Sequence, residues 1–519
     1  MRGQVSSPML RHPCQTTISS ARSRCGLALR AIALWALPAL GSLGLVSAQE
    51  ASPPPALFGY AEPVVPATFA PYPSLTPPDV FTPATPAVPT IVAPPTVAPA
   101  PHFDPAVMPA SYLAADPAKA SGGDAKKLDA KSSWVDISGE KWTVKLGGHV
   151  QLDLVEWAQA MAPPIPAQNY FEFRRLRLMA DGAGYGVFDF RIQIDIEPEA
   201  GEGTSTPVAD IKDAYLSMNE LPAIWKRWRI GNFFVPYSLE QVTNDTNNIF
   251  LERSIPTQGI FAADREVGMA LYGVSDDMNH TWTSGIFLDS ISESLKERID
   301  DAQGCRLSGR LTWLPYYDEA SNGRYLVHLG AGTLFSQEQD DLIRFRARPQ
   351  IHEGPFLIDT GLIPGSSTTS ANLEFATVWG QLSVQSEWFV TGANLANDTT
   401  STVYGGYAYL SYFLTGENRI YERFGQHGAQ FGRNVPFSNF FLTRGGNGWG
   451  GWEFKMRSSY LGLQELNAGR YNDLTVGMNW YWTDRIRIMF DWIHPWTSAQ
   501  TTYGQTSSDI LGTRFDFNF

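Results

Sequence analysis

Arginine and lysine side chains recur at alternate positions of short runs from about residue 170 to the end of the chain. In FEFRRLRL, Arg175 and Arg177 stand two residues apart, so both lie on one face of an extended strand. A guanidinium group stays charged and presents planar donors that suit oxyanions. Along a narrow passage, such fixed positive charges can replace the water that an anion loses. The candidates for this anion path are Arg175, Arg177, Arg191, Arg229, Arg306, Arg310, Lys455, Arg457 and Arg487.

Each candidate also has a simpler interpretation as half of an ion pair within a wall. Carboxylates such as Glu172, Asp189 and Asp213 could neutralise a neighbouring arginine. For any single arginine, this structural pairing explains the residue at least as well as contact with a solute. Arg174 stays undecided, because strict alternation places it with Leu176 on the opposite face.

A long segment, residues 231–268, separates two strand-like runs. An ordinary connection has roughly 4–6 residues, whereas this one is rich in both apolar and charged side chains. We expect the loop at 234–266 to fold inward and narrow a barrel; the alternative is a surface excursion packed on itself. Asp264, Arg265 and Glu266 are expected to fix the loop rather than to meet a solute. The candidate constriction residues are Glu240, Glu252, Arg253, Asp264 and Arg265.

The first 48 residues have the pattern of a secretory signal peptide. Five arginines precede an apolar run that ends in Val46-Ser47-Ala48, which resembles a cleavage site. The alternative, an uncleaved membrane anchor, fits less well because the run is short and contains Pro38. Cleavage removes the five arginines and no acidic residue, so the formal charge changes from −13 to −18. Cys305 then remains alone, and the mature chain cannot form an internal disulfide.

Residues 49–133 are dominated by proline and alanine, with valine and threonine. Frequent proline removes backbone donors and favours extended polyproline II conformations, which predicts a disordered, semi-rigid linker. The alternative is a tether that contacts the cell wall or an envelope partner through residues 49–131.

From residue 134 to the end, short runs alternate in polarity with a period of two and are separated by turn residues. Sixteen such runs can be counted, and no amphipathic helix pattern competes with them. In residues 187–197 the apolar face carries phenylalanine and isoleucine, and the other face carries charged residues and glutamine. A barrel with lipid outside and a wet lumen inside gives both faces a suitable environment. The predicted fold class is therefore all-β, a transmembrane antiparallel β-barrel of about sixteen strands over residues 134–519.

Connection lengths and the last strand support this prediction. Short turns follow the even-numbered strands and long loops follow odd-numbered ones, as in outer-membrane barrels. One connection breaks the rule: residues 415–451 follow an even strand, and they could enter the lumen or cover the mouth. The final strand alternates aromatic residues and ends at Phe519, the form taken by the last strand of outer-membrane barrels.

From residue 142 to the end, the chain resembles the phosphate-selective porin O/P family. The resemblance rests on FEFRRLRL, on GNFFVPYSLEQVT at 231–243, on FLER at 250–253, on FLTGE at 413–417, and on GMNWYWTDRIRIMFDWIH at 477–494. It implies a sixteen-strand outer-membrane barrel, commonly trimeric, with an inward third loop and an anion path lined by arginine and lysine. One departure is Phe234, where the family often has a lysine.

The expected function is an outer-membrane porin for passive diffusion of small hydrophilic solutes, including anions such as phosphate. The alternative is an envelope-anchoring barrel whose Pro-rich segment binds cell wall. A hydrolase is not expected, because no G-x-S-x-G motif occurs near His427 or His494. No cofactor, metal ion or nucleic-acid partner is expected, and His149 has no neighbouring cysteine or histidine to share a metal.

Overall fold

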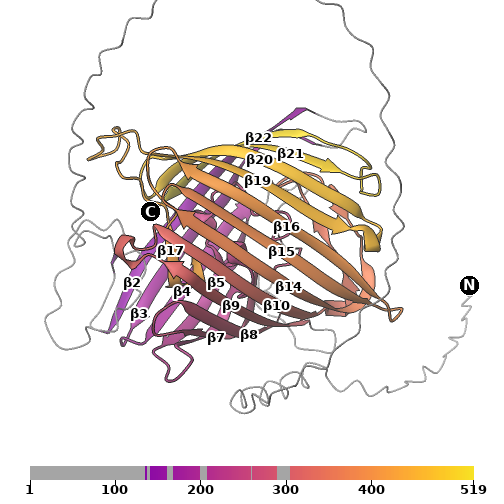
Figure 1. Ribbon diagram of the computed structural model, residues 1–519, viewed down its shortest axis with the longest axis horizontal. Helices are drawn as coiled ribbons and strands as arrows, with labels where there is room; N and C mark the ends of the chain where they lie inside the picture. The colour runs from indigo at the N-terminus through magenta and orange to yellow at the C-terminus, as the bar shows by residue number, and fades with distance from the viewer. Residues whose placement is uncertain (1–134, 137–140, 160–166, 199–206, 259, 289–303) are drawn as a thin grey trace, which may run out of the picture. The chain divides into compact units, whose positions relative to one another are not determined.

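The computed structural model describes residues 135–136, 141–159, 167–198, 207–258, 260–288 and 304–519 (Figure 1). The signal peptide predicted at 1–48 and the linker predicted at 49–133 lie outside the described residues. All features reported below belong to one compact unit of the chain. Among the described residues, no helix is both long and apolar enough to cross a membrane.

An 18-stranded antiparallel sheet dominates the described part of the chain (Figure 1). Two of its members are the short strands β1 (Val135–Asp136) and β11 (Leu342–Ile343), and the other sixteen are long. The long strands are β2 (Trp142–Gln159), β3 (Tyr170–Gly184), β4 (Phe188–Pro198), β5 (Pro207–Asn219), β6 (Arg227–Phe234), β7 (Arg265–Val274), β8 (His280–Phe287), β9 (Cys305–Tyr317), β10 (Tyr325–Gln337), β14 (Ile363–Trp379), β15 (Leu382–Leu395), β16 (Thr400–Phe413), β19 (Gly451–Leu463), β20 (Gly469–Tyr481), β21 (Ile486–Thr497) and β22 (Asp509–Asn518).

Each long strand pairs with the next, and the last pairs with the first. β2 and β22 are antiparallel, with Gln151 opposite Asp516, and the backbone of Phe519 exchanges hydrogen bonds of 3.0 and 3.1 Å with Gly148. The sheet is therefore closed and has no free edge among its long strands. The prediction of an all-β antiparallel barrel with about sixteen strands is confirmed.

Polarity alternates across the wall as the sequence pattern predicts. In β4, Ile192 and Ile194 are exposed on the outside, whereas Arg191, Gln193 and Asp195 are buried on the inside. The outside of the barrel is apolar and its lumen is charged, the arrangement of a barrel set in lipid.

Most of the smaller elements belong to three connections that contact the inner wall. The connection from β6 to β7 holds the helix α2 (Leu239–Val242) and the 3-10 turn η2 (Asp245–Asn247). The connection from β10 to β14 contains η4 (Gln339–Asp341), β11 and a hairpin of β12 (Arg346–Ala347) with β13 (Ile358–Asp359). The connection from β16 to β19 contains a hairpin of β17 (Tyr421–Gly425) with β18 (Gly428–Phe431). Two further 3-10 turns, η3 (Glu319–Ser321) and η5 (Gln464–Leu466), lie between barrel strands.

Closure of the barrel depends on a glycine in β2. A Cβ atom on Gly148 would lie 2.3 Å from the carbonyl oxygen of Arg177 and 2.7 Å from the ring of Phe519. We expect Gly148→Ala to lower the free energy of unfolding by about 1–3 kcal/mol, the usual cost of overpacking. Gly309→Ala is the matched control, because its Cβ would make only ordinary contacts, with Thr333 Oγ1 at 3.4 Å and the carbonyl oxygen of Thr283 at 4.0 Å. Urea unfolding of the refolded variants measures the difference, and equal stability of the two would contradict this account.

Candidate functional site

The connection from β6 to β7 runs through the barrel interior as residues 235–264, which we call the constriction loop. It is slightly shorter than the expected 234–266, because β6 continues through Phe234 and β7 already begins at Arg265. Its helix α2 is fixed at the N-terminal end by Glu387 of β15, whose carboxylate accepts the backbone N–H groups of Leu239 and Glu240 at 3.0 and 2.7 Å. A carboxylate at this end satisfies backbone donors that have no partner within the helix.

Apolar side chains attach one side of the constriction loop to the wall. Phe261 stacks on Phe389 of β15 with ring centroids 5.9 Å apart, and Tyr237 packs on the same ring at 6.1 Å. Phe250 meets Tyr409 of β16 at 5.5 Å. These rings are buried, so part of the lumen is filled by an apolar contact between loop and wall.

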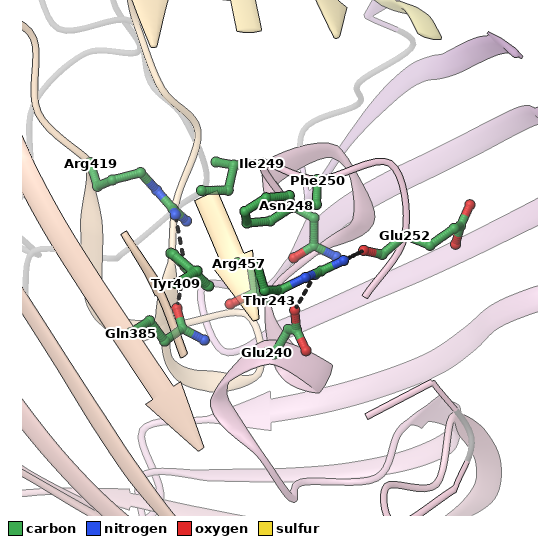
Figure 2. Close-up of a pocket in the computed structure, with 10 residues that line it drawn as sticks. All are labelled: Glu240, Thr243, Asn248, Ile249, Phe250, Glu252, Gln385, Tyr409, Arg419 and Arg457. Atoms are coloured by element: carbon green, nitrogen blue, oxygen red, sulfur yellow. Dashed lines mark hydrogen bonds and ion pairs between the residues drawn. The ribbon is translucent and has the colours of Figure 1, made fainter. Parts of the chain in front are cut away.

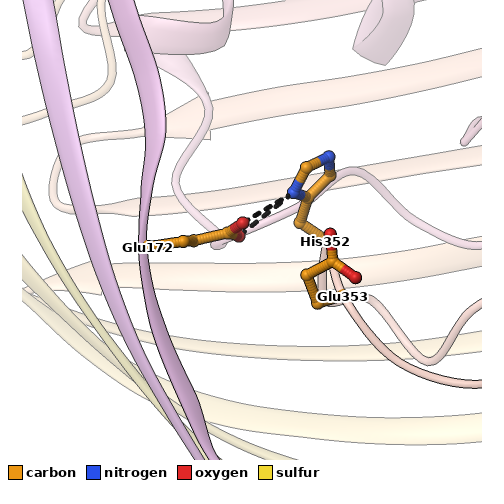
Figure 3. A group of neighbouring side chains, drawn as sticks. All are labelled: Glu172, His352 and Glu353. Atoms are coloured by element: carbon orange, nitrogen blue, oxygen red, sulfur yellow. Dashed lines mark hydrogen bonds and ion pairs between the residues drawn. The ribbon is translucent and has the colours of Figure 1, made fainter. Parts of the chain in front are cut away.

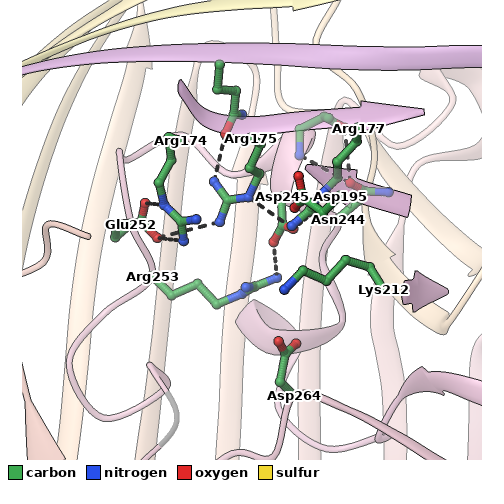
Figure 4. Close-up of polar contacts among 12 residues, drawn as sticks. Arg174, Arg175, Arg177, Asp195, Lys212, Asn244, Asp245, Glu252, Arg253 and Asp264 are labelled. Carbon is green, nitrogen blue, oxygen red and sulfur yellow. Dashed lines mark hydrogen bonds and ion pairs between the residues drawn. The ribbon is translucent and has the colours of Figure 1, made fainter. Parts of the chain in front are cut away.

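The other side of the constriction loop carries Asp245, on which four guanidinium groups converge. Figure 4 shows three of them, from Arg175, Arg177 and Arg253. The Asp245 carboxylate lies 2.6 Å from Arg177 Nη1 and 2.7 Å from Arg253 Nη2, with Arg175 Nε at 3.6 Å and Arg265 Nη2 at 3.7 Å. Burial disfavours the charged carboxylate, but the surrounding arginines outweigh it and hold the pKa of Asp245 well below its ordinary value. The Asp245 carboxylate is therefore an anion surrounded by arginine side chains.

Glu252 makes a second attachment of the same kind. Its carboxylate lies 2.8 Å from Arg174 Nε and 2.8 Å from Arg514 Nη2, and 3.6 Å from Arg175 Nη2. Burial again opposes ionisation, yet these arginines keep the pKa of Glu252 well below its ordinary value. Arg514 on β22, which also pairs with Asp153 at 2.6 Å, was not among the residues expected from the sequence. Its position in the alternating terminal strand would have indicated an inward side chain.

A β-bulge explains the undecided position of Arg174. Gln151 of β2 pairs with Arg175 of β3, and Leu152 pairs with Phe173, so Arg174 is an extra residue without an opposite partner. A bulge interrupts strict alternation and can redirect a side chain. Arg174 therefore turns toward Glu252 beside Arg175, instead of following Leu176 to the outer face (Figure 4).

A second bulge directs Lys212 of β5 toward the same region (Figure 4). Gln193 of β4 pairs with Asp213 and Ile194 with Ile211, which leaves Lys212 as the extra residue. The amide of Asn232 donates to the carbonyl oxygens of Ile211 and Lys212 at 3.3 and 2.9 Å, so the disturbed backbone stays satisfied. Lys212 Nζ lies 2.7 Å from Asp210. Pure alternation could not identify this cation.

Arg457 of β19 joins the constriction loop to another part of the wall (Figure 2). Its guanidinium donates to Glu240 at 3.2 Å, to the carbonyl oxygen of Glu252 at 3.0 Å and to Gln350 at 2.5 Å. Arg419 lies across the space and donates to Tyr409 at 2.9 Å. The cavity between them measures about 10 Å³, close to the smallest volume that holds one water molecule.

Two other expected cations bind backbone carbonyl groups of the constriction loop. Lys455 Nζ lies 2.7 Å from Asp491 and donates to Ile249 O at 2.5 Å. Arg487 pairs with Asp516 at 2.8 Å and donates to Asn248 O at 2.7 Å. Arg306 is different from these two cations: it is only half-buried, and it pairs with the side chain of Glu266 of β7, next to Arg265.

The remaining three contact the β17–β18 hairpin, which enters the lumen from the end where the chain terminates. Arg310 Nη1 donates to Ala429 O at 2.9 Å, Arg191 Nη1 to Gln426 at 2.8 Å, and Arg229 Nη1 lies 3.4 Å from His427 Nδ1. The hairpin reaches the constriction loop, since Asn247 donates to Phe431 O at 3.3 Å. This places residues 421–431 of the uncertain segment 415–451 inside the barrel.

The expected anion-path residues thus all face the interior, and eight of the nine are buried. The structure brings Arg175 and Arg177 together with Arg253 and Arg265 of the expected constriction set. Asp264 stands apart, with 59% of its side chain exposed and a 3.5 Å contact to Arg265. Phe234 occupies the position where the family often has a lysine. Its ring lies under the guanidinium group of Arg265, with 3.8 Å between the ring centroid and Arg265 Cζ. A role for these residues toward a solute stays a prediction.

Comparison with known proteins places this geometry in a family. A family model described as phosphate-selective porin O and P matches residues 144–519. An uncharacterized protein of Caulobacter vibrioides is 28% identical over 416 residues, covering 75% of this chain and 77% of its own. Porin O of Pseudomonas aeruginosa is 21% identical over 421 residues, covering 74% and 90%.

Solved structures of outer-membrane proteins are also similar. The anion-selective porin from Comamonas acidovorans is 12% identical, with a TM-score of 0.43, and covers 73% of this chain and 100% of its own. The outer-membrane protein OmpT of Vibrio cholerae, in its trimer form, is 7% identical with a TM-score of 0.44 and the same coverage. The family match spans nearly the whole barrel, so the chain belongs to the phosphate-selective porin O and P family and is a porin of the bacterial outer membrane, not an enzyme.

Proposed function

We propose that this porin allows small hydrophilic solutes to diffuse passively, and that anions, phosphate among them, are favoured along the wall that carries the expected arginines. The observation that supports this proposal most is the convergence of Arg175, Arg177, Arg253 and Arg265 on one loop carboxylate, Asp245. A group of guanidinium donors that binds a carboxylate has the chemistry needed to bind a phosphate. Membership in a family described as phosphate-selective porins also supports a preference for anions.

The internal ion pairs fit transport better than storage of an anion. A channel must bind its ion strongly enough to admit it and weakly enough to release it. The carboxylates of Asp245 and Glu252 already neutralise part of the positive charge on the wall. A passing anion therefore competes with these carboxylates for the same donors, and binding remains weak.

Neutralising two wall arginines tests the proposal. We expect Arg175→Gln with Arg177→Gln to lower the anion-to-cation permeability ratio about tenfold, which corresponds to about 1.4 kcal/mol. The reversal potential across a planar bilayer in a chloride gradient, repeated with phosphate, measures this ratio. The matched control is Arg444→Gln with Arg470→Gln, which removes the same charge from two exposed side chains.

An unchanged ratio in the first variant would contradict the anion path while leaving the porin function intact. A cation-selective reversal potential in the unmodified protein would contradict the anion preference itself.

A second proposal concerns the organisation of the whole protein. We propose export by residues 1–48, a linker at 49–133, an inward constriction loop within the barrel at 134–519, and assembly as a homotrimer. The mass of the detergent-solubilised complex tests the trimer. Sedimentation of residues 49–131 with purified cell wall tests the alternative of an envelope anchor.

A further inference from the structure

Three side chains outside the proposed anion path meet where the β12–β13 hairpin approaches the barrel wall (Figure 3). Glu172 projects from β3, while His352 and Glu353 are neighbours in the segment 348–357 that joins β12 to β13. His352 Nδ1 lies 3.1 and 3.0 Å from the two carboxylate oxygens of Glu172. One donor atom from each of the three residues fits within a span of 4.8 Å.

These distances are close to those of ligand atoms around a small metal ion. Zinc binds histidine nitrogen and carboxylate oxygen at about 2.0–2.2 Å in a tetrahedral arrangement, which separates neighbouring ligand atoms by about 3.4 Å. The three donors therefore need only small side-chain rotations to reach one ion. Imidazole nitrogen selects zinc-like transition ions over calcium or magnesium, which prefer oxygen ligands.

The backbone that carries the donors is fixed on both sides of His352. Ile351 is buried with Trp157 of β2 and Ile510 of β22, and Gln350 is fully buried and bonded to Arg457 and Asp473. The N–H of Glu353 donates to the hydroxyl of Tyr170 at 3.2 Å. Because a preorganised site loses little entropy on binding, this anchoring favours a metal ion.

The local charges leave a place for a cation. The carboxylate of Glu353 accepts no hydrogen bond from the described residues, and it lies half-buried beside the carboxylate of Glu172. The nearby cations are engaged elsewhere, since Arg174 binds Glu252 and Arg348 donates to Gly354 O at 2.8 Å. Two carboxylates and a neutral imidazole would balance one divalent ion.

We propose that Glu172, His352 and Glu353 form a binding site for a zinc-type divalent ion that ties segment 348–357 to β3. Both β3 and this connection meet at the end of the barrel opposite to Phe519, where the constriction loop also enters. Three protein ligands leave a fourth position for water or for a solute group. The ion would hold Gln350, two residues before His352, against Arg457 in the lumen. Sequence spacing gave no sign of this site, because Glu172 and His352 are 180 residues apart.

Titration calorimetry of the full protein in detergent micelles, purified without a histidine tag and stripped with a chelator, tests the site. With zinc chloride as the probe, we expect one ion per chain. His352→Ala should weaken binding by about tenfold or more, since loss of even a supporting partner costs about 10–100-fold. Glu353→Gln should weaken binding similarly, and its fold is safe because this carboxylate has no hydrogen bond to lose.

His494→Ala is the matched control. His494 also pairs with a carboxylate, Asp509 at 2.8 Å, but no third ligand completes a site there among the described residues. Zinc binding that is equally weakened in His494→Ala, or that survives both His352→Ala and Glu353→Gln, would overturn the proposal. Binding of calcium as tight as that of zinc would overturn the assignment of His352 as a ligand.

Discussion

Replacing Asp245 by asparagine is expected to release the constriction loop from the charged part of the wall. The single carboxylate of Asp245 contacts four arginines, with oxygen-to-nitrogen distances between 2.6 and 3.7 Å: Arg175, Arg177, Arg253 and Arg265. Removing one partner of a buried charge network costs about 3–5 kcal/mol, because the remaining charges lose their compensation. We expect faster cleavage of residues 235–264 by an added protease, and a reversal potential shifted toward anions.

Asp264→Asn provides the control for this experiment. Asp264 belongs to the same loop and has the same charge, but its side chain is largely exposed and its one ion pair is long. Exposed pairs of this kind contribute about 0–1 kcal/mol, so neither protease sensitivity nor selectivity should change. Identical behaviour of the two variants would show that Asp245 does not hold the loop.

The pH dependence of loop attachment follows from the same contacts. The arginines hold the pKa values of Asp245 and Glu252 below their ordinary values of 3.8 and 4.5. A lowered pKa gives stability that is fully present above the ordinary value and is lost as the pH falls through the lowered one. We therefore expect the difference in protease resistance between the unmodified protein and Asp245→Asn to be the same at pH 5 and pH 8.

The barrel could be predicted from the sequence because each strand repeats one physical rule. Because lipid and water occupy opposite faces of the wall, the alternation between Ile192 and Arg191 determines which side chain points outward and which points inward. The rule fails where lipid is absent: β14 begins at Ile363, whereas the alternating pattern in the sequence begins only about ten residues later, at Leu373. Residues 366–372, SSTTSAN, form strand without an apolar face, so no alternation marked them.

The site was less predictable because its geometry depends on contacts between distant segments. Inward arginines could be identified, but their carboxylate partners from the constriction loop could not. The two bulges at Arg174 and Lys212 depend on pairing register, which a single strand does not reveal. The entry of residues 421–431 into the lumen was left open for the same reason, since its contacts lie on β4, β6 and β9.

Shortening the β17–β18 hairpin is expected to produce the largest rise in conductance. Within the described residues, the hairpin occupies the lumen between Arg191, Arg229 and Arg310, and Phe431 touches the constriction loop through Asn247. Replacing residues 421–431 by a short glycine-serine linker removes this obstruction and exposes the arginines to water. Because the strand pairs of the barrel do not include the hairpin, the wall should remain closed.

We expect single-channel conductance to increase several-fold and selectivity to shift toward anions. Deleting residues 442–446 is the control, since Leu442 and its neighbours belong to the same connection but are largely exposed. A narrow passage limits the current at its tightest part, so removal of an exposed segment should leave the current unchanged. If conductance were equal in the two deletions, the hairpin would not limit the passage, and the constriction loop alone would set the width of the channel.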